Sequence, residues 1–292
     1  MFVISISVLV ASAVAVAVFG LNFGVDFKGG SITEIEFVNS RPDISEIRDV
    51  LGRADIPNLQ EFSVNVAGSR SVVIRAGQLS EDEHQRLLSV FSEAFRSDQP
   101  REVRFDSIGP AIGAELKRRS ITAIIILLAA VLLYIAFMFR TLSRSLSLWA
   151  MAAGTILGLA HDIIIPMGVF AVLGHYGGVQ ISAVFVAAVL TILGYTVSDK
   201  VVIYDRVREN ILRGARADLP ELVHQSVMQT LVRSINNTLV VMLSSLAVFL
   251  FGGESIRYFA LALMIGIGLG AYSSIFVASP LLVWLSRNRR PR

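Results

Sequence analysis

Six long apolar stretches divide the chain. Each runs for about 18 or more residues with almost no charged side chain, the length that carries a helix across about 30 Å of hydrocarbon. We therefore expect six membrane-spanning helices. They lie near Phe2–Gly20, Ile121–Phe139, Leu146–Leu173, Ile181–Tyr204, Ser234–Phe251 and Ile256–Leu285. The first, within residues 1–20, reads as an uncleaved anchor, since no basic segment precedes it and no clear cleavage site follows. The other five are expected to form one bundle within residues 120–292.

The segment between the first two spans, residues 21–119, has the pattern of a folded domain. From Leu21 to Ser120 the chain contains 16 acidic and 13 basic residues. Alternating apolar positions predict strands, and stripes at helical spacing behind Asp43 and Ser80 predict two capped helices. The resulting order, βαββαβ, is the α+β ferredoxin-like pattern, which many unrelated functions share.

Composition narrows the function classes. The mean hydropathy is +0.65, with 54% hydrophobic and 17% charged residues, as in a membrane protein. The chain has no cysteine, and it lacks a phosphate-binding loop, a dinucleotide fingerprint and zinc-ligand spacing. His84 is expected on the exposed face of its helix, and the other histidines are poor metal ligands. We therefore expect no enzyme, no cofactor and no metal site.

The basic residues indicate orientation. Three short segments rich in arginine lie on one side of the spans, whereas the connections 174–180 and 252–255 contain no Lys or Arg. This predicts cytoplasmic termini and an extracytoplasmic position for residues 21–119. The pI of about 9.4 thus reflects membrane orientation, and nucleic acid is not expected as a partner. The arginines concerned are Arg140, Arg144, Arg206, Arg208, Arg213, Arg216, Arg287, Arg289, Arg290 and Arg292.

Glycine and proline residues mark both ends of the predicted domain, and one connection between spans has a helical pattern. Gly29 and Gly30 precede the domain, and Gly109 and Pro110 follow it, so these four residues are candidate hinges. Ordinary turns would use the same residues. The pattern after Asp218 predicts a cytoplasmic interfacial helix near residues 218–232.

Three charged residues fall inside the predicted spans. A charge at mid-membrane depth costs about 2.5 to 3.5 kcal/mol on insertion scales, which makes each one a functional candidate. Asp199 lies in the fourth span, with Tyr195 and Thr196 one turn earlier. Asp162 lies deeper, in the third span, one turn before Pro166. It is a candidate second station of a proton relay, although a solvated carboxylate beside a helix kink fits the same pattern.

Arg233 enters the fifth span at a depth similar to that of Asp199. Asn236 and Asn237 follow three and four residues later, so they share its side of the helix. We expect Asp199 and Arg233 to pair, with the two asparagines as a polar shell around them. The pair could carry protons or could be a static bridge between helices.

Four segments resemble the SecF family: Gly24–Gly30, Gly194–Asn210, Phe251–Glu254 and Tyr272–Phe276. SecF is the smaller partner of the SecD/SecF membrane pair of the bacterial protein-export system, a relative of the RND transporters. The resemblance covers essentially the whole chain, in the same order and topology.

The resemblance implies an accessory of the Sec translocon in the bacterial inner membrane, driven by the proton-motive force. The partners that it implies are a SecD-like subunit, separate or fused, a SecYEG-type channel, exported unfolded polypeptides and membrane lipid. The family's intramembrane acid and arginine fall on Asp199 and Arg233. Lys200 departs from the small polar residue usual after that acid, and we expect its side chain to extend to the cytoplasm.

Two alternatives stay open. An RND-type exporter of lipid or small molecules would need a ligand cavity. A scaffold of the translocon that transduces no energy would need no titratable site. Replacing Asp199 by Asn distinguishes a scaffold, which should keep working, from a proton-coupled subunit.

Overall fold

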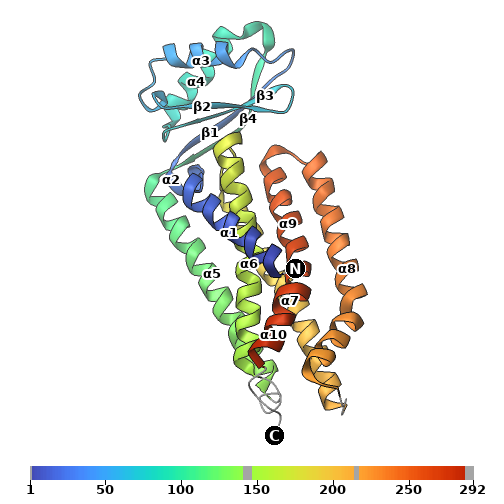
Figure 1. Ribbon diagram of the computed structural model, residues 1–292. Helices are drawn as coiled ribbons and strands as arrows, with labels where there is room; N and C mark the ends of the chain where they lie inside the picture. Colours follow the sequence, from blue (N-terminus) through green and yellow to red (C-terminus); the bar gives the residue numbers. More distant parts are fainter. Residues whose placement is uncertain (1, 141–146, 214–216, 287–292) are drawn as a thin grey trace. The chain divides into compact units, whose positions relative to one another are not determined.

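A computed structural model describes residues 2–140, 147–213 and 217–286 (Figure 1). The chain divides into two compact units: the membrane bundle, Met1–Asn22 with Ile121–Arg292, and the α/β domain, Phe23–Ser120. Some of the arginines used to predict orientation lie outside the described residues, namely Arg144, Arg216, Arg287, Arg289, Arg290 and Arg292.

The α/β domain is built on a four-stranded antiparallel sheet with the strand order β2-β3-β1-β4. This order, with a helix after β1 and another after β3, confirms the ferredoxin-like βαββαβ fold. Along the chain the elements are α2 (Val25–Lys28), β1 (Gly30–Phe37), α3 (Ile44–Arg53), β2 (Ser63–Ala67), β3 (Ser71–Ala76), α4 (Glu81–Ala94) and β4 (Pro100–Ile108).

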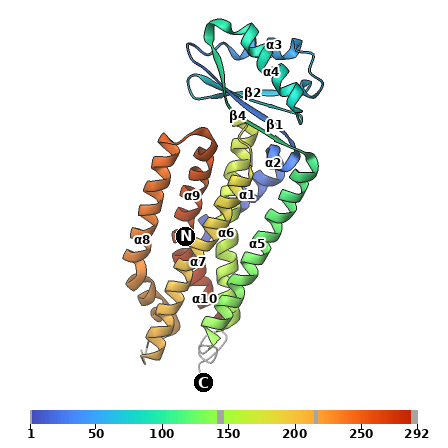
Figure 2. The same ribbon diagram turned by 180° about the vertical axis from the view of Figure 1, so that it is seen from behind.

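Both long helices of the domain cover the same face of the sheet (Figures 1 and 2). Alternate residues of β1 point to this face, and Ile35 and Phe37 are 1% and 0% exposed. They belong to one core cluster with Leu51 of α3 and with Leu87 and Phe91 of α4. The period of two in the strand and the helical stripes of the two helices therefore meet in one core.

The prediction for His84 was wrong. The residue is 4% exposed, and its ring stacks on Phe105 with the centroids 3.6 Å apart. Its Nε2 lies 3.0 Å from Oε1 of Glu102. Because His84 is three and seven residues before Leu87 and Phe91, it shares the buried face of α4 with them.

Within the described residues, six helical segments are long and apolar enough to span a membrane, which confirms the predicted number. Helices α6, α7 and α9 pack against one another, α1 packs on α6, and α8 packs on α7 and α9. The helices are α1 (Phe2–Phe19), α5 (Pro110–Met138), α6 (Leu148–Gly177), α7 (Ala183–Leu212), α8 (Leu219–Phe251), α9 (Glu254–Ser273) and α10 (Ser279–Ser286), with the π-helical segment Ser274–Ala278 joining the last two.

The predicted interfacial helix near residues 218–232 is not a separate element. Asp218 caps α8 by accepting a hydrogen bond from the amide of Glu221 at 3.3 Å, as its pattern suggested. The helix then continues without a break to Phe251. No glycine or proline lies between Glu221 and Phe251, so nothing in the sequence ends the helix at the membrane surface.

Small residues allow close contact between helices α7 and α9. A Cβ atom on Gly270 would lie 2.0 Å from Cγ2 of Thr196, and one on Gly266 would lie 2.3 Å from Cδ1 of Ile192. The two glycines are four residues apart and thus form one small face.

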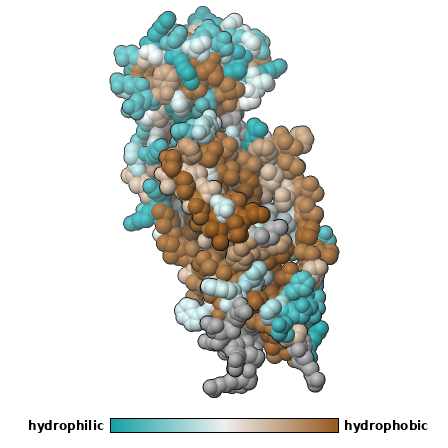
Figure 3. All heavy atoms as spheres, viewed as in Figure 1, coloured by the Kyte–Doolittle hydropathy of each residue, from teal (hydrophilic) through white to brown (hydrophobic). Residues whose placement is uncertain are grey.

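Apolar side chains dominate the visible face of the bundle in Figure 3. Helices α1 and α5 each keep only 11% of their most apolar window buried inside the chain. Such surfaces are those that lipid or a second membrane subunit covers.

Candidate functional site

Two carboxylates lie in the packed interior of the membrane bundle. Asp162 of α6 is 0% exposed, and Asp199 of α7 is 9% exposed. A buried carboxylate needs a compensating partner, so the neighbours of each acid decide what it can do.

Asp162 has partners on both oxygens. Nζ of Lys200 in α7 lies 2.8 Å from Oδ2 of Asp162, and both side chains are 0% exposed. Nδ1 of the neighbouring His161 lies 3.3 Å from Oδ1. The carboxylate is therefore enclosed by protein groups that replace its hydration.

The ammonium of Lys200 is also fully satisfied. It donates to Oγ of Ser273 at 3.0 Å and to the backbone carbonyl of Thr196 at 3.4 Å, in addition to Asp162. An ammonium has three protons, and each finds an acceptor. Side chains from α6, α7 and α9 meet here, and we call Asp162, Lys200 and Ser273 the three-helix charge cluster.

The expectation that Lys200 extends to the cytoplasm was wrong. A Cβ atom on Gly158 of α6 would lie 2.5 Å from Cε of Lys200, so this glycine makes room for the aliphatic stem. Asp162, one turn further along α6, offers a counter-ion at the point that the stem reaches. A lysine with a buried partner gains nothing by snorkelling to water.

Asp199 has a different environment, on the side of α7 that faces α8. Its Oδ2 is buried and has no hydrogen-bond partner among the described residues. Ser234 of α8 faces the carboxyl group. Of its expected polar shell, Tyr195 stays beside it, whereas Thr196 turns its methyl group toward Gly270 of α9.

The expected ion pair between Asp199 and Arg233 is not formed within the described part of the chain. Arg233, Asn236 and Asn237 lie on the exposed side of α8, whereas Ser234 and Thr238 are 6% and 5% exposed and point inward. Successive residues of a helix are about 100° apart, so the arginine and the two asparagines share one face and the inward pair shares the next. Ser234, and not Arg233, is thus the residue of α8 that faces inward beside Asp199.

The segment after Ser273 departs from a regular α-helix. Residues Ser274–Ala278 are π-helical, a geometry that occurs often at functional sites. Oγ of Ser274 donates to the carbonyl of Gly270 at 2.7 Å, and Oγ of Ser279 donates to the carbonyl of Ser274 at 2.7 Å. These serines satisfy carbonyls around the wide turn beside the charge cluster.

The four candidate hinge residues lie together at the edge of the α/β domain. Gly29 and Gly30 have φ values of 81° and 133°, which favour glycine. A Cβ atom on Gly29 would lie 2.8 Å from Cα of Pro110, which follows Gly109 directly. The start of β1 and the start of α5 thus lie side by side within the α/β unit, and movement at this joint stays a prediction.

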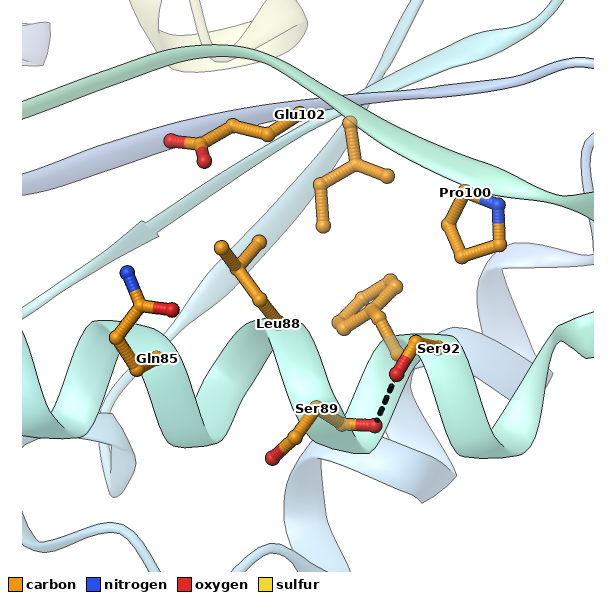
Figure 4. A pocket seen from close by; sticks show the side chains of 8 residues that line it. Gln85, Leu88, Ser89, Ser92, Pro100 and Glu102 are labelled. Atoms are coloured by element: carbon orange, nitrogen blue, oxygen red, sulfur yellow. Dashed lines mark hydrogen bonds between the residues drawn. The ribbon is translucent and has the colours of Figure 1, made fainter.

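A shallow groove of about 350 Å³ lies between α4 and β4 of the α/β domain (Figure 4). Of its lining residues only Glu102 is titratable, and it already contacts His84. The groove therefore offers no cluster of reactive groups, and the candidate functional site is in the membrane bundle. The groove is lined by Ile35, Gln85, Leu88, Ser89, Phe91, Ser92, Pro100 and Glu102.

Comparison with known families gives two matches. Residues 90–288 match the family described as protein export membrane protein SecD/SecF, C-terminal, and residues 14–40 match the SecD/SecF GG motif. The first match contains the charge cluster and Asp199, and the second contains Gly29 and Gly30.

Individual relatives agree with these matches. The chain is 37% identical to the protein translocase subunit SecF of Thermobaculum terrenum, over 97% of this chain and 90% of the relative. It is 36% identical to the SecF subunit of Synechocystis, over 92% of this chain and 84% of the relative. A protein translocase subunit SecDF from Brucella abortus is 37% identical over 96% of this chain, which covers 36% of that longer protein.

Solved structures give the same relationship. The crystal structure of SecDF from Thermus thermophilus, described as a translocon-associated membrane protein, matches with a TM-score of 0.84 at 31% identity. The match covers 98% of this chain and 37% of that one. A second SecDF structure, in a super-membrane-facing form, has a TM-score of 0.65 at 32% identity. The chain thus spans a little over a third of the SecDF proteins that it matches.

Proposed function

The chain belongs to the SecD/SecF family of protein export membrane proteins, and on this basis we propose that it works as a subunit of a protein translocase. It is a multi-pass membrane protein in which the proton-motive force assists the passage of exported, unfolded polypeptides. It performs no chemical conversion. The observation that carries proton coupling is Asp199, a buried membrane carboxylate whose Oδ2 has no hydrogen-bond partner among the described residues.

Asp199 is the proton-binding group in this proposal. Protonation removes a charge from the contact between α7 and α8, and so changes the relative stability of two packing arrangements of these helices. Moving one charge through 100 mV is worth about 2.3 kcal/mol, which is enough to bias an element whose two states differ by a few kcal/mol.

The exposed polar face of α8 is the proposed contact with a second membrane subunit. Arg233, Asn236 and Asn237 would be costly against lipid, and a partner with an acidic or amide side chain at that depth would satisfy them. The relatives in which SecD and SecF form one chain support a SecD-like partner, separate or fused. Arg233 then pairs with that partner, and a protonation change at Asp199 reaches it through movement of α8 rather than through a direct ion pair.

The proposal also includes the orientation of the chain, its membrane and its further partners. The α/β domain lies outside the cytoplasm, both termini lie inside, and the membrane is the bacterial inner membrane. A SecYEG-type channel and its exported polypeptides are the partners outside the SecD-like subunit.

The rival exporter of lipid or small molecules gains little support. The concavities described in the α/β domain are a groove of about 350 Å³ and a second one of about 640 Å³ whose lining includes Asn58, Glu61 and Arg75. Both grooves are open to the surface and have mixed polar and apolar linings, so neither encloses a lipid chain as a buried apolar cavity would.

The decisive experiment replaces Asp199 by Asn in inner-membrane vesicles that carry the complex with its SecD-like partner. Export of a model polypeptide is measured with and without a proton-motive force. The variant should insert normally and should show the export level of de-energised vesicles under both conditions, because Asn cannot bind and release a proton.

Asp205→Asn is the matched control. It makes the same change in the same helix, at an exposed carboxylate that pairs with Arg208 at 3.3 Å. The control should keep the full stimulation. If Asp199→Asn also keeps it, proton coupling through Asp199 is refuted and the scaffold interpretation takes its place.

A further inference from the structure

We propose that Lys200 is the fixed counter-ion of Asp162, and that this pair clamps α6, α7 and α9 together instead of carrying protons. Asp162 is then removed from the proton relay expected from the sequence. The removal of Asp162 from the proton relay rests on the proposed function, whereas the clamp itself does not.

The first argument is the completeness of the contacts. The ammonium has three acceptors from three helices, at 2.8, 3.0 and 3.4 Å, and the carboxylate has a donor on each oxygen. Both residues are 0% exposed. A group that carries protons must exchange partners with water or with another acid, whereas both groups of this pair are buried and each proton of the ammonium already has an acceptor.

Apart from each other and His161, Asp162 and Lys200 form no ion pair with another charged side chain in the described residues. His161 of α6 contacts Asp162, and its ring stacks on Tyr272 of α9 with the centroids 5.9 Å apart. The hydroxyl of Tyr272 lies 2.8 Å from Oγ of Ser5 in α1. Asp199, the other carboxylate nearby, precedes Lys200 in α7 but faces α8. Contacts thus run from Asp162 through His161 and Tyr272 to Ser5, and they connect α1 to the charge cluster.

The second argument is the fit of the lysine stem. Gly158 is the residue of α6 that the stem crosses, and any side chain there would collide with Cε of Lys200. Thr196, one turn before Lys200, fits closely against Gly270 of α9. These contacts hold α7 in the register that brings the ammonium to Asp162 and Ser273, so the lysine is built into the packing of all three helices.

A double-mutant cycle tests the clamp. Removing one member of a buried ion pair leaves an uncompensated charge, whereas removing both is often nearly neutral. Lys200→Met, Asp162→Asn and the combined variant are made in the full chain, purified with its membrane partner, and compared by apparent melting temperature. Each single change should lower that temperature by about 10 °C, and the combined variant should recover at least half of the loss.

Additive losses in the combined variant would overturn the clamp, and so would its failure to accumulate in the membrane. Melting temperatures need no export activity. This part of the test therefore holds even if the proposed function is wrong.

Proton-dependent export then separates a clamp from a relay. The combined variant should keep the stimulation by the proton-motive force, because it removes the pair without leaving a charge and leaves Asp199 in place. A combined variant that melts like the wild type but has lost the stimulation would place Asp162 on the proton path and contradict the proposal. If the wild-type complex itself shows no stimulation, the proposed function fails while the melting cycle still decides the clamp.

Discussion

Asp199 and Lys200 are consecutive residues of α7 with opposite environments. Lys200 points toward α6 and α9, where three acceptors enclose its ammonium, and Asp199 points toward α8, where its Oδ2 lacks a hydrogen-bond partner among the described residues. A rotation of about 100° per residue separates the two side chains. One helix can therefore hold a paired charge beside a carboxyl group that has no ion-pair partner among the described residues.

Gly270→Ala should destabilise the bundle. The new methyl group would lie 2.0 Å from Cγ2 of Thr196, a β-branched side chain that cannot rotate away easily, so α9 must move from α7. We expect a loss of about 1 to 3 kcal/mol, measured as a lower apparent melting temperature of the purified full chain.

Gly194→Ala is the control for this change. Nothing lies within 4 Å of the added Cβ atom, and alanine is the better helix former, so this variant should melt at the wild-type temperature or above. Equal melting of the two variants would contradict the close packing of α7 and α9.

The sequence contained part of the information about Lys200. At 1.5 Å per residue, Asp162 is about 20 Å from Leu148 at the start of α6, and Lys200 is about 20 Å from Leu212 at the end of α7. Consecutive spans run antiparallel, so equal depths could have predicted that the two charges meet. The rotation of α8, which turns Arg233 outward, could not be predicted in this way. The apolar side chains of α8 are spread around the whole helix, so they mark no single face as the buried one.

At the scale of the element, two helices of the α/β domain begin with the same sequence pattern and end up with different caps. In α4, Glu83 accepts from the amide of Ser80 at 2.8 Å and from the side chain of Asn58 at 2.9 Å. In α3, the side chain of Asp43 makes no capping bond. The amide of Ser80, followed by the side-chain amide of Asn58, lowers the pKa of Glu83 below its ordinary value. The pattern predicted both helix starts, but only the fold decides which cap forms.

The cap of α4 should depend on pH. Because the pKa of Glu83 is lowered in the folded chain, its stabilisation is present above the ordinary glutamate value and is lost as the pH falls through the lowered one. Hydrogen exchange of the first turn of α4, corrected for intrinsic rates, should accelerate over that range. Glu83→Gln should flatten the dependence, and the first turn of α3 serves as an internal control.

The variant Ser80→Ala measures how strongly the cap stabilises the first turn of α4. Loss of an N-cap typically costs about 1 kcal/mol, which corresponds to about fivefold faster exchange of those amides at neutral pH. Unchanged protection in Ser80→Ala would mean that packing of Leu87 and Phe91 alone fixes the start of the helix.

At the scale of the whole molecule, hydrophobicity and order along the chain sufficed for the architecture. Long apolar runs gave the six spans, and short alternating runs gave the ferredoxin-like order. The continuity of α8 through its polar first half was missed, since a partly apolar face after a cap suits an interfacial helix as well as the end of a span.

The predicted orientation can be tested with single cysteines, because the native chain has none. Ser69 lies in the turn between β2 and β3, whereas Thr141 and Ala215 lie outside the described residues, in the connections predicted to be cytoplasmic. An impermeant thiol reagent applied to intact cells should label Ser69→Cys and neither of the other two variants. The reverse pattern would overturn the orientation.

The joint at Gly29 and Pro110 determines how the α/β domain bears a mechanical load. Gly30 of β1 pairs with Ile108 of β4, so the chain enters β1 and leaves β4 at the same end of two antiparallel neighbouring strands. A force that pulls these two chain ends apart breaks the hydrogen bonds between β1 and β4 one pair after another. These bonds are perpendicular to the strands, so the pair nearest the two ends carries the force first. The register shift between Glu34 and Ile35 interrupts that ladder. The stretch from Arg104 to Ile108 of the edge strand β4 can therefore separate from β1 as a short tether. Strand β1 stays paired with β3 from Ser31 to Glu36, and Phe37 keeps it anchored in the core.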